Sequence, residues 1–98
     1  MSRVVYTRAA DRDLAEIAPS TLEHWGAAQC ANYLDLLEQT CERIIIPQNL
    51  QHTRTVPNRP ELRQWRCERH VICLRILRRH AIEIVRVLHE RILPESYL

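Results

Sequence analysis

Residues 82–91 read IEIVRVLHER, and this is the most informative stretch of the chain. It begins as a strand with apolar side chains on both faces and ends in a cluster of titratable residues, Arg86, His89, Glu90 and Arg91. A strand that is apolar on both faces must be covered on both, so it lies inside a sheet. The titratable residues then sit on a rigid frame where the sheet meets water. Such a cluster is typical of a site or an interface, although a solvated strand end would also produce it.

The segments around this strand predict its neighbours in the sheet. Residues 62–68 alternate in character, and residues 70–77 are nearly apolar throughout. Residues 78–80 (RRH) form a connection short enough for a hairpin. At the amino terminus, residues 3–7 (RVVYT) read as one further short strand. The sequence therefore predicts a carboxy-terminal meander of three strands that is joined by the amino-terminal strand.

A first helix is predicted from Ala10 onward, where apolar residues recur at near-helical spacing. We assign the acidic residues of this segment, among them Asp13 and Glu16, to the opposite side of the helix. Pro19 predicts a kink or a brief break, because proline lacks the backbone donor that a helix needs. Residues 20–23 (STLE) fit a capping box that restarts the helix after the proline.

A second helix follows Gly26, the only glycine of the chain. Glycine accepts the left-handed backbone that helix ends commonly need, so Gly26 ends the first helix. Pro47 stops the second helix. The connection at Gly26 is so short that the two helices must form an antiparallel hairpin. The second helix carries one continuous apolar stripe formed by Cys30, Tyr33, Leu34, Leu37, Cys41, Ile44 and Ile45.

The order of these elements defines the fold class. Residues 48–60 are polar and are expected to form a loop. The fold class is then α+β, a small antiparallel sheet of the amino-terminal strand and the carboxy-terminal meander, with the antiparallel helix hairpin packed on one face. The 98 residues suffice for a single domain, 1–98. Charged residues at 27% and hydrophobic residues at 46% are typical of a globular chain.

All 14 basic residues are arginines, and they are unevenly placed. Residues 1–50 hold four Arg and seven acids, whereas residues 51–98 hold ten Arg and five acids. The second half thus favours an acidic protein segment or nucleic acid as partner, or simply forms solvated faces with local ion pairs. Trp65 is expected to pack against the helix hairpin, with Arg63 and Arg66 directed toward solvent or a partner.

The four cysteines indicate reduced, mostly buried thiols, because they lie among apolar neighbours. The chain shows neither a secretory signal nor a segment long enough to span a membrane, so we expect a cytoplasmic protein. Cys67, His70 and Cys73 are the nearest approach to a metal-ligand set. Cys67 and Cys73 belong to different segments joined by a turn, and the sequence has no CxxC pair. We therefore expect no metal site and no cofactor.

Three strings, in this order, resemble the ParE toxins of the RelE/ParE superfamily, small bacterial proteins encoded beside an antitoxin. Residues 25–37 (WGAAQCANYLDLL) are similar to the pattern W-G-x-x-Q-A-x-x-Y-x-x-x-L. Residues 63–66 (RQWR) resemble the arginine-rich second strand, and residues 82–91 resemble the closing signature I-x-V-x-R-[IV]-L-H-x-R. Residues 71–76 (VICLRI) depart from the family, which commonly has an aromatic-rich Y-R motif there.

This resemblance implies a toxin of a type II toxin–antitoxin (plasmid stabilisation) module that inhibits DNA gyrase by binding, without chemistry of its own. We expect the target to contact Arg86, His89 and Arg91 at the end of the last strand, supported by Arg63 and Arg66 on a neighbouring strand. Arginine makes strong contacts of defined geometry to carboxylates, and the rigid sheet would hold several in a fixed array.

The resemblance also implies a cognate antitoxin. It is expected to be ParD-like, with an acidic and partly disordered carboxy-terminal segment that gains structure on binding, and to form a hetero-oligomer with the toxin. Trp25, Tyr33 and Leu36 exceed what one apolar face of the hairpin needs. They are predicted to bind the antitoxin, or alternatively to close the core of a small domain.

Two other functions remain open. A ribosome-dependent messenger-RNA endonuclease of the RelE type would need a base, an acid and groups that stabilise the phosphate. The chain offers Glu68 or Glu90, His89 and Tyr97 beside its arginines, but no lysine and no spacing that demands chemistry, so no catalytic residue is assigned. The third possibility is a non-toxic binding module on the same fold.

Overall fold

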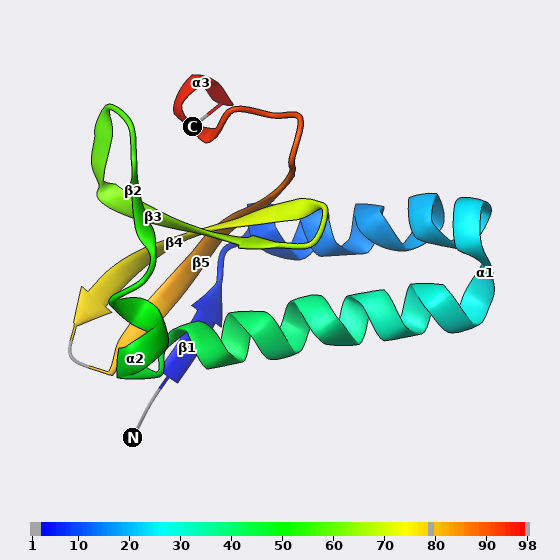
Figure 1. Ribbon diagram of the computed structural model, residues 1–98, viewed down its shortest axis with the longest axis horizontal. Helices are drawn as coiled ribbons and strands as arrows, with labels where there is room; N and C mark the ends of the chain where they lie inside the picture. Colours follow the sequence, from blue (N-terminus) through cyan, green and yellow to red (C-terminus); the bar gives the residue numbers. More distant parts are fainter. Residues whose placement is uncertain (1–2, 79, 98) are drawn as a thin grey trace.

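The computed structural model describes residues 3–78 and 80–97, and the side chains of these residues apart from 18–25. The described residues form a five-stranded sheet with the order β1-β5-β4-β3-β2 (Figure 1). Residues 82–89 therefore lie in the strand next to one edge of the sheet and have a neighbouring strand on each side. The strands are β1 (Arg3–Tyr6), β2 (Arg54–Val56), β3 (Arg59–Cys67), β4 (His70–Arg78) and β5 (Ala81–His89).

The predicted meander and amino-terminal strand are confirmed, but the sheet is mixed rather than antiparallel throughout. β3, β4 and β5 pair antiparallel in sequence, whereas β1 pairs parallel with β5, from Arg3↔Ala81 to Tyr6↔Ile84. After β1 the chain passes through the helix hairpin and re-enters the sheet in β2, which runs opposite to β1. Three further reversals, into β3, β4 and β5, leave β5 parallel to β1, and parallel neighbours require such a long connection.

The helix hairpin is confirmed and is formed by α1 (Arg8–Ile44). Figure 1 shows its two arms running antiparallel along one side of the sheet and projecting beyond it. The arms meet at Gly26, whose φ of 86° and ψ of 173° are non-helical. Of the kink or brief break that we predicted at Pro19, the break was wrong, because the chain is helical there. A proline removes one backbone donor, whereas the backbone of Gly26 redirects the chain. The side chains of the predicted capping box, residues 20–23, lie outside the described residues.

The polar loop predicted at residues 48–60 was wrong in part. It contains most of the short helix α2 (Pro47–Leu50) and all of β2. Pro47 opens α2, a position where the missing backbone donor is not needed. Neither element is long enough to show an apolar period, so the sequence pattern could not reveal them. Three of the described residues take positive φ in the turns between β2 and β5, where the chain has no glycine: Asn58, Glu68 and His80.

The core lies between the hairpin and the sheet. The predicted stripe of the second arm is confirmed, because Leu37 and Cys41 are fully buried and pack with Ile72 and Ile84 of the sheet. Trp65 packs against the same cluster, as predicted. The four cysteines form no disulfide with one another and are buried, as the prediction of reduced, buried thiols requires. Burial raises the pKa of Cys41 to about 12, and that of Cys73 likewise to about 12.

The carboxy-terminal segment turns back after β5 and ends in α3 (Pro94–Tyr97) (Figure 1). Pro94 is buried, whereas Leu93 and Tyr97 are exposed. None of the helices in the described part of the chain combines the length and hydropathy that crossing a membrane requires.

Candidate functional site

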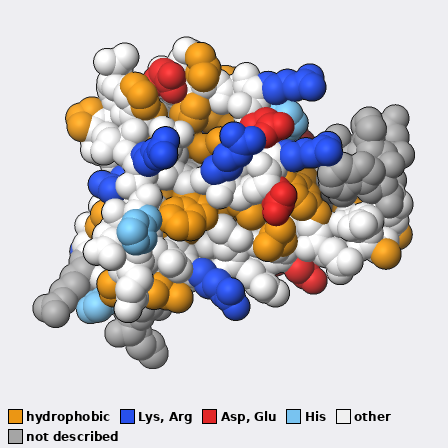
Figure 2. Space-filling model, viewed as in Figure 1, with side chains coloured by type: hydrophobic (Ala, Val, Ile, Leu, Met, Phe, Trp, Pro, Cys, Tyr) orange, Lys and Arg blue, Asp and Glu red, His pale blue; other side chains and the backbone are white. Residues whose placement is uncertain are grey.

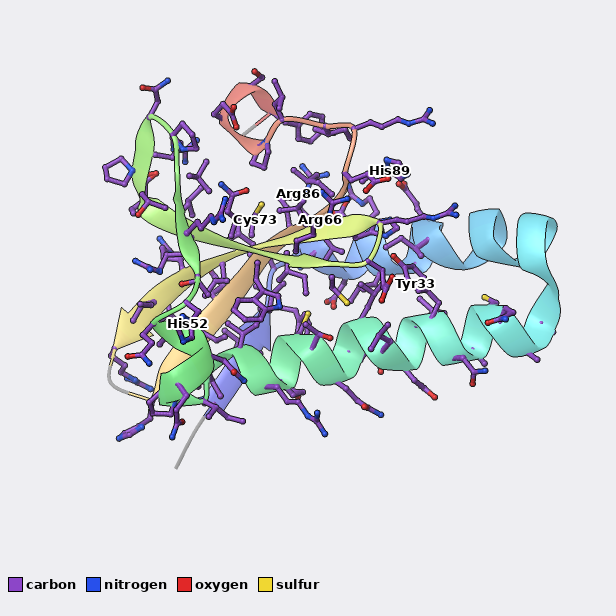
Figure 3. All side chains as sticks on the ribbon, in the orientation of Figure 1. Tyr33, His52, Arg66, Cys73, Arg86 and His89 are labelled. Carbon is purple, nitrogen blue, oxygen red and sulfur yellow. The ribbon has the colours of Figure 1, made fainter. Side chains whose placement is uncertain are left out.

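An open pocket of about 440 Å³ lies where β5 ends. We call it the β5-end pocket. It receives side chains from both arms of α1, from β4 and the turn before it, from β5 and from the carboxy-terminal segment, with apolar walls that include Ile17 and Ile92. Figure 3 shows Tyr33, Arg86 and His89 on the same side of the molecule and His52 well away from them. Its charged and imidazole side chains are Asp13, Glu16, Arg69, His70, Arg86, His89 and Arg91.

Asp13 and Arg86 form the best-defined ion pair of the site. The guanidinium donates from Nε to Asp13 Oδ2 at 2.7 Å and from Nη2 to Asp13 Oδ1 at 2.8 Å. The Asp13 side chain is only 10% exposed and the Arg86 side chain 21%. The hydrogen bond with Asp13 is the chief cause that raises the pKa of Arg86, so this guanidinium remains charged at any physiological pH.

Asp13 also completes the edge of the sheet. The pairing of β1 with β5 ends at Tyr6↔Ile84, so the second half of β5 borders α1 instead of a strand. There Val87 N–H donates to Asp13 Oδ2 at 2.9 Å, and Thr7 Oγ1 donates to the carbonyl of Val85 at 2.7 Å. Asp13 therefore holds the first arm of α1 against β5 and orients Arg86 at the same time.

Asp13 is the residue that the sequence reasoning misplaced. It is 9% exposed and lies on the buried side of α1, not on the solvent side. Ala10 and Ile17 lie three residues before it and four after it, and both are buried. Because residues at these spacings share one helix face, the position of Asp13 within the apolar stripe was a readable signal.

Tyr33 and His70 connect the hairpin to the sheet. Tyr33 Oη lies 2.6 Å from His70 Nδ1 and accepts the backbone N–H of Arg69 at 3.2 Å. Which of the two groups donates in this contact depends on the tautomer of His70. Burial raises the pKa of Tyr33, which keeps the phenol protonated. Burial also lowers the pKa of His70, and charge on His89 lowers it further.

His89 stands edge-on to His70, with ring centroids 5.5 Å apart and an interplanar angle of 78°. His89 Nδ1 accepts the backbone N–H of Arg91 at 3.2 Å. The neutral ring therefore carries its proton on Nε2. On the far side of the pocket, the Tyr97 ring centroid lies 4.8 Å from Arg86 Cζ, a cation–π contact that places α3 beside the ion pair.

Only some of the predicted target-binding residues come together. Arg86, His89 and Arg91 line the β5-end pocket, whereas Arg63 and Arg66 do not. The expectation that Arg63 points toward solvent or a partner was wrong, because its Nη2 donates to the carbonyl of Thr53 at 2.6 Å and fixes the start of β2. Arg66 is largely exposed and pairs with Glu90, which follows β5.

The predicted antitoxin-binding residues also separate. Leu36 is 39% exposed on the second arm of α1. Tyr33 is half-buried and faces the β5-end pocket. The side chain of Trp25 lies outside the described residues.

The residues considered for metal binding or catalysis are held in other contacts. Cys67 Sγ lies 3.4 Å from Thr40 Oγ1, and His70 is bonded to Tyr33. Within the described residues, no three His, Cys, Asp or Glu side chains converge in a way that could hold a metal ion. Of the two proposed bases, Glu90 is paired with Arg66, and Glu68 occupies the β3–β4 turn with a φ of 53°.

The fold of this chain is shared with a solved structure. A solved structure described as "Chromosomal ParDE TA system from P. aeruginosa" is similar to this chain, with a TM-score of 0.75 and 20% sequence identity. The similarity covers 91% of this chain and 95% of that one. At this identity the similarity shows the shared fold.

The sequence comparisons show the family. Residues 4–94 match the family described as "ParE toxin of type II toxin-antitoxin system, parDE". A protein described as "Toxin ParE" from Escherichia coli is 36% identical over 92 residues, which span 93% of this chain and 87% of that protein. The chain therefore belongs to the ParE toxin family and is the toxin component of a type II toxin–antitoxin system. An antitoxin is its partner in such a system.

Proposed function

We propose that this toxin inhibits DNA gyrase by binding and that a ParD-like antitoxin neutralises it. The observation that carries the proposal is the convergence of Arg86, His89 and Arg91 on one open pocket at the end of β5. Gyrase acts in the cytoplasm, so the proposed toxin acts there as well.

The site suits binding better than catalysis. Asp13 fixes Arg86 through two hydrogen bonds, and the sheet fixes the backbone that carries Arg86 and His89. A preorganised array of this kind loses little conformational entropy when a protein partner docks. The candidate base Glu90 is already paired with Arg66, a contact that favours structure over proton transfer.

The antitoxin is proposed to bind apart from this pocket, across the hairpin and an exposed part of the sheet. β3 pairs with β4 as far as Arg63↔Leu74, and β4 continues to Arg78. Ile76 and Leu77 lie on this extension and are 47% and 45% exposed. An extended segment can add to such a strand through backbone hydrogen bonds, while a helical part covers Leu36.

The charge pattern favours an acidic antitoxin segment. Residues 51–98, which include β4 and β5, hold ten arginines and five acids. Figure 2 shows arginine side chains spread over one face of the molecule with acidic side chains between them. This interspersed arrangement suits a partner with its own charge pattern more than the uniform backbone of a nucleic acid.

Two assays on the purified toxin test the proposed target. Gyrase supercoiling of relaxed plasmid is expected to stop, while messenger RNA on translating ribosomes stays intact. Arg91→Gln is expected to weaken the inhibition, and Arg54→Gln, an exposed arginine of β2, serves as the matched control. Cleavage of messenger RNA together with normal supercoiling would contradict gyrase inhibition and support the endonuclease function instead. If both substrates were unaffected, the protein would be a binding module without this activity.

A further inference from the structure

We propose that the β5-end pocket is a carboxylate-binding site, which takes a single acidic side chain presented by the toxin's target protein. This inference rests on the proposed function and names the chemical group that the pocket recognises. It is carried by three properties of the pocket: its hydrogen-bond donors, its net charge and its apolar walls.

Hydrogen-bond donors dominate the pocket. Because His89 Nδ1 accepts the backbone N–H of Arg91, the neutral His89 ring presents Nε2–H as a donor. Arg91 adds an exposed guanidinium. On the acceptor side, both oxygens of Asp13 already accept hydrogen bonds from Arg86 or Val87, and the other carboxylate is that of the exposed Glu16 at the rim. The site is therefore rich in donors and needs an acceptor, which an anion supplies.

The formal charge matches a monoanion. The groups that face the pocket come from every element around it: Asp13 and Glu16 from the first arm of α1, and Arg69, Arg86 and Arg91 from the sheet side. With neutral imidazoles, the described residues that line the pocket carry three positive and two negative charges, a balance of +1. A carboxylate cancels this charge. A phosphate dianion would leave an excess negative charge unless an imidazole took up a proton.

The pocket is larger than a carboxylate alone. Its volume of about 440 Å³ and its walls at Ile17, Val87 and Ile92 leave room for the methylene stem of a side chain. An acidic side chain on the surface of a target protein has both a methylene stem and a carboxylate. Its stem would contact the apolar walls, and its carboxylate would reach Arg91 and the two imidazoles.

Base stacking, the alternative use of an aromatic side chain in a basic pocket, is less favoured. Tyr97 is the aromatic ring at the carboxy-terminal wall, and one face of this ring is already occupied by the Arg86 guanidinium. Tyr33 is tied to His70 and to the backbone of Arg69. The two rings therefore support the polar groups of the site.

Nuclear magnetic resonance of the intact toxin tests this inference through its histidine ring protons. The probe is glutamate blocked as its N-acetyl, N-methylamide derivative, and blocked glutamine is the neutral control of the same shape. Blocked glutamate is expected to shift the His70 and His89 resonances in a saturable way and to leave His52 and His80, outside the pocket, unchanged. Its affinity should rise as the pH falls, because a bound anion raises the pKa of an adjacent imidazole.

Arg91→Gln provides the matched variant, because Arg91 is exposed and its loss leaves the Asp13–Arg86 pair intact. The dissociation constant for blocked glutamate is expected to increase roughly tenfold, the usual effect of losing one charged hydrogen bond. Arg54→Gln, outside the pocket, is expected to bind like the unaltered protein.

Several results would overturn the inference. Equal shifts with blocked glutamine, or no saturable shift with blocked glutamate, would remove the carboxylate site. Saturable binding of inorganic phosphate without binding of blocked glutamate would make it a phosphate site instead. Gyrase inhibition that is unchanged in Arg91→Gln would show that the target does not use the pocket. By contrast, a toxin that binds blocked glutamate but never inhibits gyrase would refute only the proposed function.

Discussion

Asp13 is the residue on which the geometry of the candidate site depends most. One carboxylate accepts two hydrogen bonds from Arg86 and one from the backbone of Val87. These contacts join the first arm of α1 to β5 and fix a permanently charged guanidinium beside the pocket. A mostly buried ion pair of this kind gives little net stability over an apolar pair, but removing one partner is costly.

Asp13→Asn is therefore expected to lower the free energy of unfolding by about 2–4 kcal/mol, because Arg86 would lose its counter-ion in a mostly buried place. Urea denaturation measures the difference. Asp11→Asn, on the exposed side of the same helical turn, is the matched control and is expected to change stability by less than about 0.5 kcal/mol. Equal effects of both substitutions would contradict the role assigned to Asp13.

His70 gives a prediction about pH. Burial lowers the pKa of His70 in the folded protein, so the unfolded chain binds this proton more readily. The stability contributed by neutral His70 is therefore present above the unfolded pKa of about 6.5 and is lost as the pH falls below it. The free energy of unfolding, measured from pH 7.5 to 5, is expected to fall less steeply in His70→Asn. An unchanged slope, or a flattening equal to that in His52→Asn at an exposed position, would contradict this.

At the scale of secondary structure, long periodic segments were predictable and short ones were not. The apolar run of β5 and the stripe that contains Leu37 and Cys41 predicted a sheet strand and a hairpin arm, and both are present. The sequence did not predict α2 and β2, because segments of four and three residues are too short to show an apolar periodicity. The partners that fix β2, such as Arg63 donating to Thr53, are tertiary contacts that one sequence does not display.

Gly26 determines the turn of the hairpin through its backbone alone. Its φ of 86° and ψ of 173° lie in a region that is almost restricted to glycine. A methyl group added there would meet no atom within 4 Å, so strain and not collision sets the cost. Gly26→Ala is expected to lower the free energy of unfolding by about 1–3 kcal/mol in urea denaturation. Ala28→Ser, at an exposed position of α1, is the control, and a Gly26→Ala protein as stable as this control would contradict the reasoning.

For the whole molecule, we propose two candidate surfaces, one charged and one apolar. The β5-end pocket gathers Arg86, His89 and Arg91 at the end of the last strand. The exposed apolar residues Ile76 and Leu36 lie on the β4 extension and on the hairpin. The sequence predicted the first group, because its members are close along the chain. It did not reveal that Tyr33 belongs to the pocket, since the hydrogen bond to His70 joins residues that are 37 positions apart.

Two such surfaces predict that antitoxin binding and gyrase inhibition respond to different substitutions. Leu36→Gln and Ile76→Gln are each expected to weaken binding of the cognate antitoxin about tenfold, because each removes about 1.5 kcal/mol of apolar burial at that interface. Both variants should inhibit gyrase normally. Arg91→Gln should do the reverse, with weaker inhibition and unchanged antitoxin affinity. Titration calorimetry at two salt concentrations and the supercoiling assay measure the two properties, and Arg54→Gln should leave both unchanged. If Arg91→Gln and Leu36→Gln instead weakened both properties together, antitoxin and gyrase would share one surface, and neutralisation would be direct competition for the β5-end pocket.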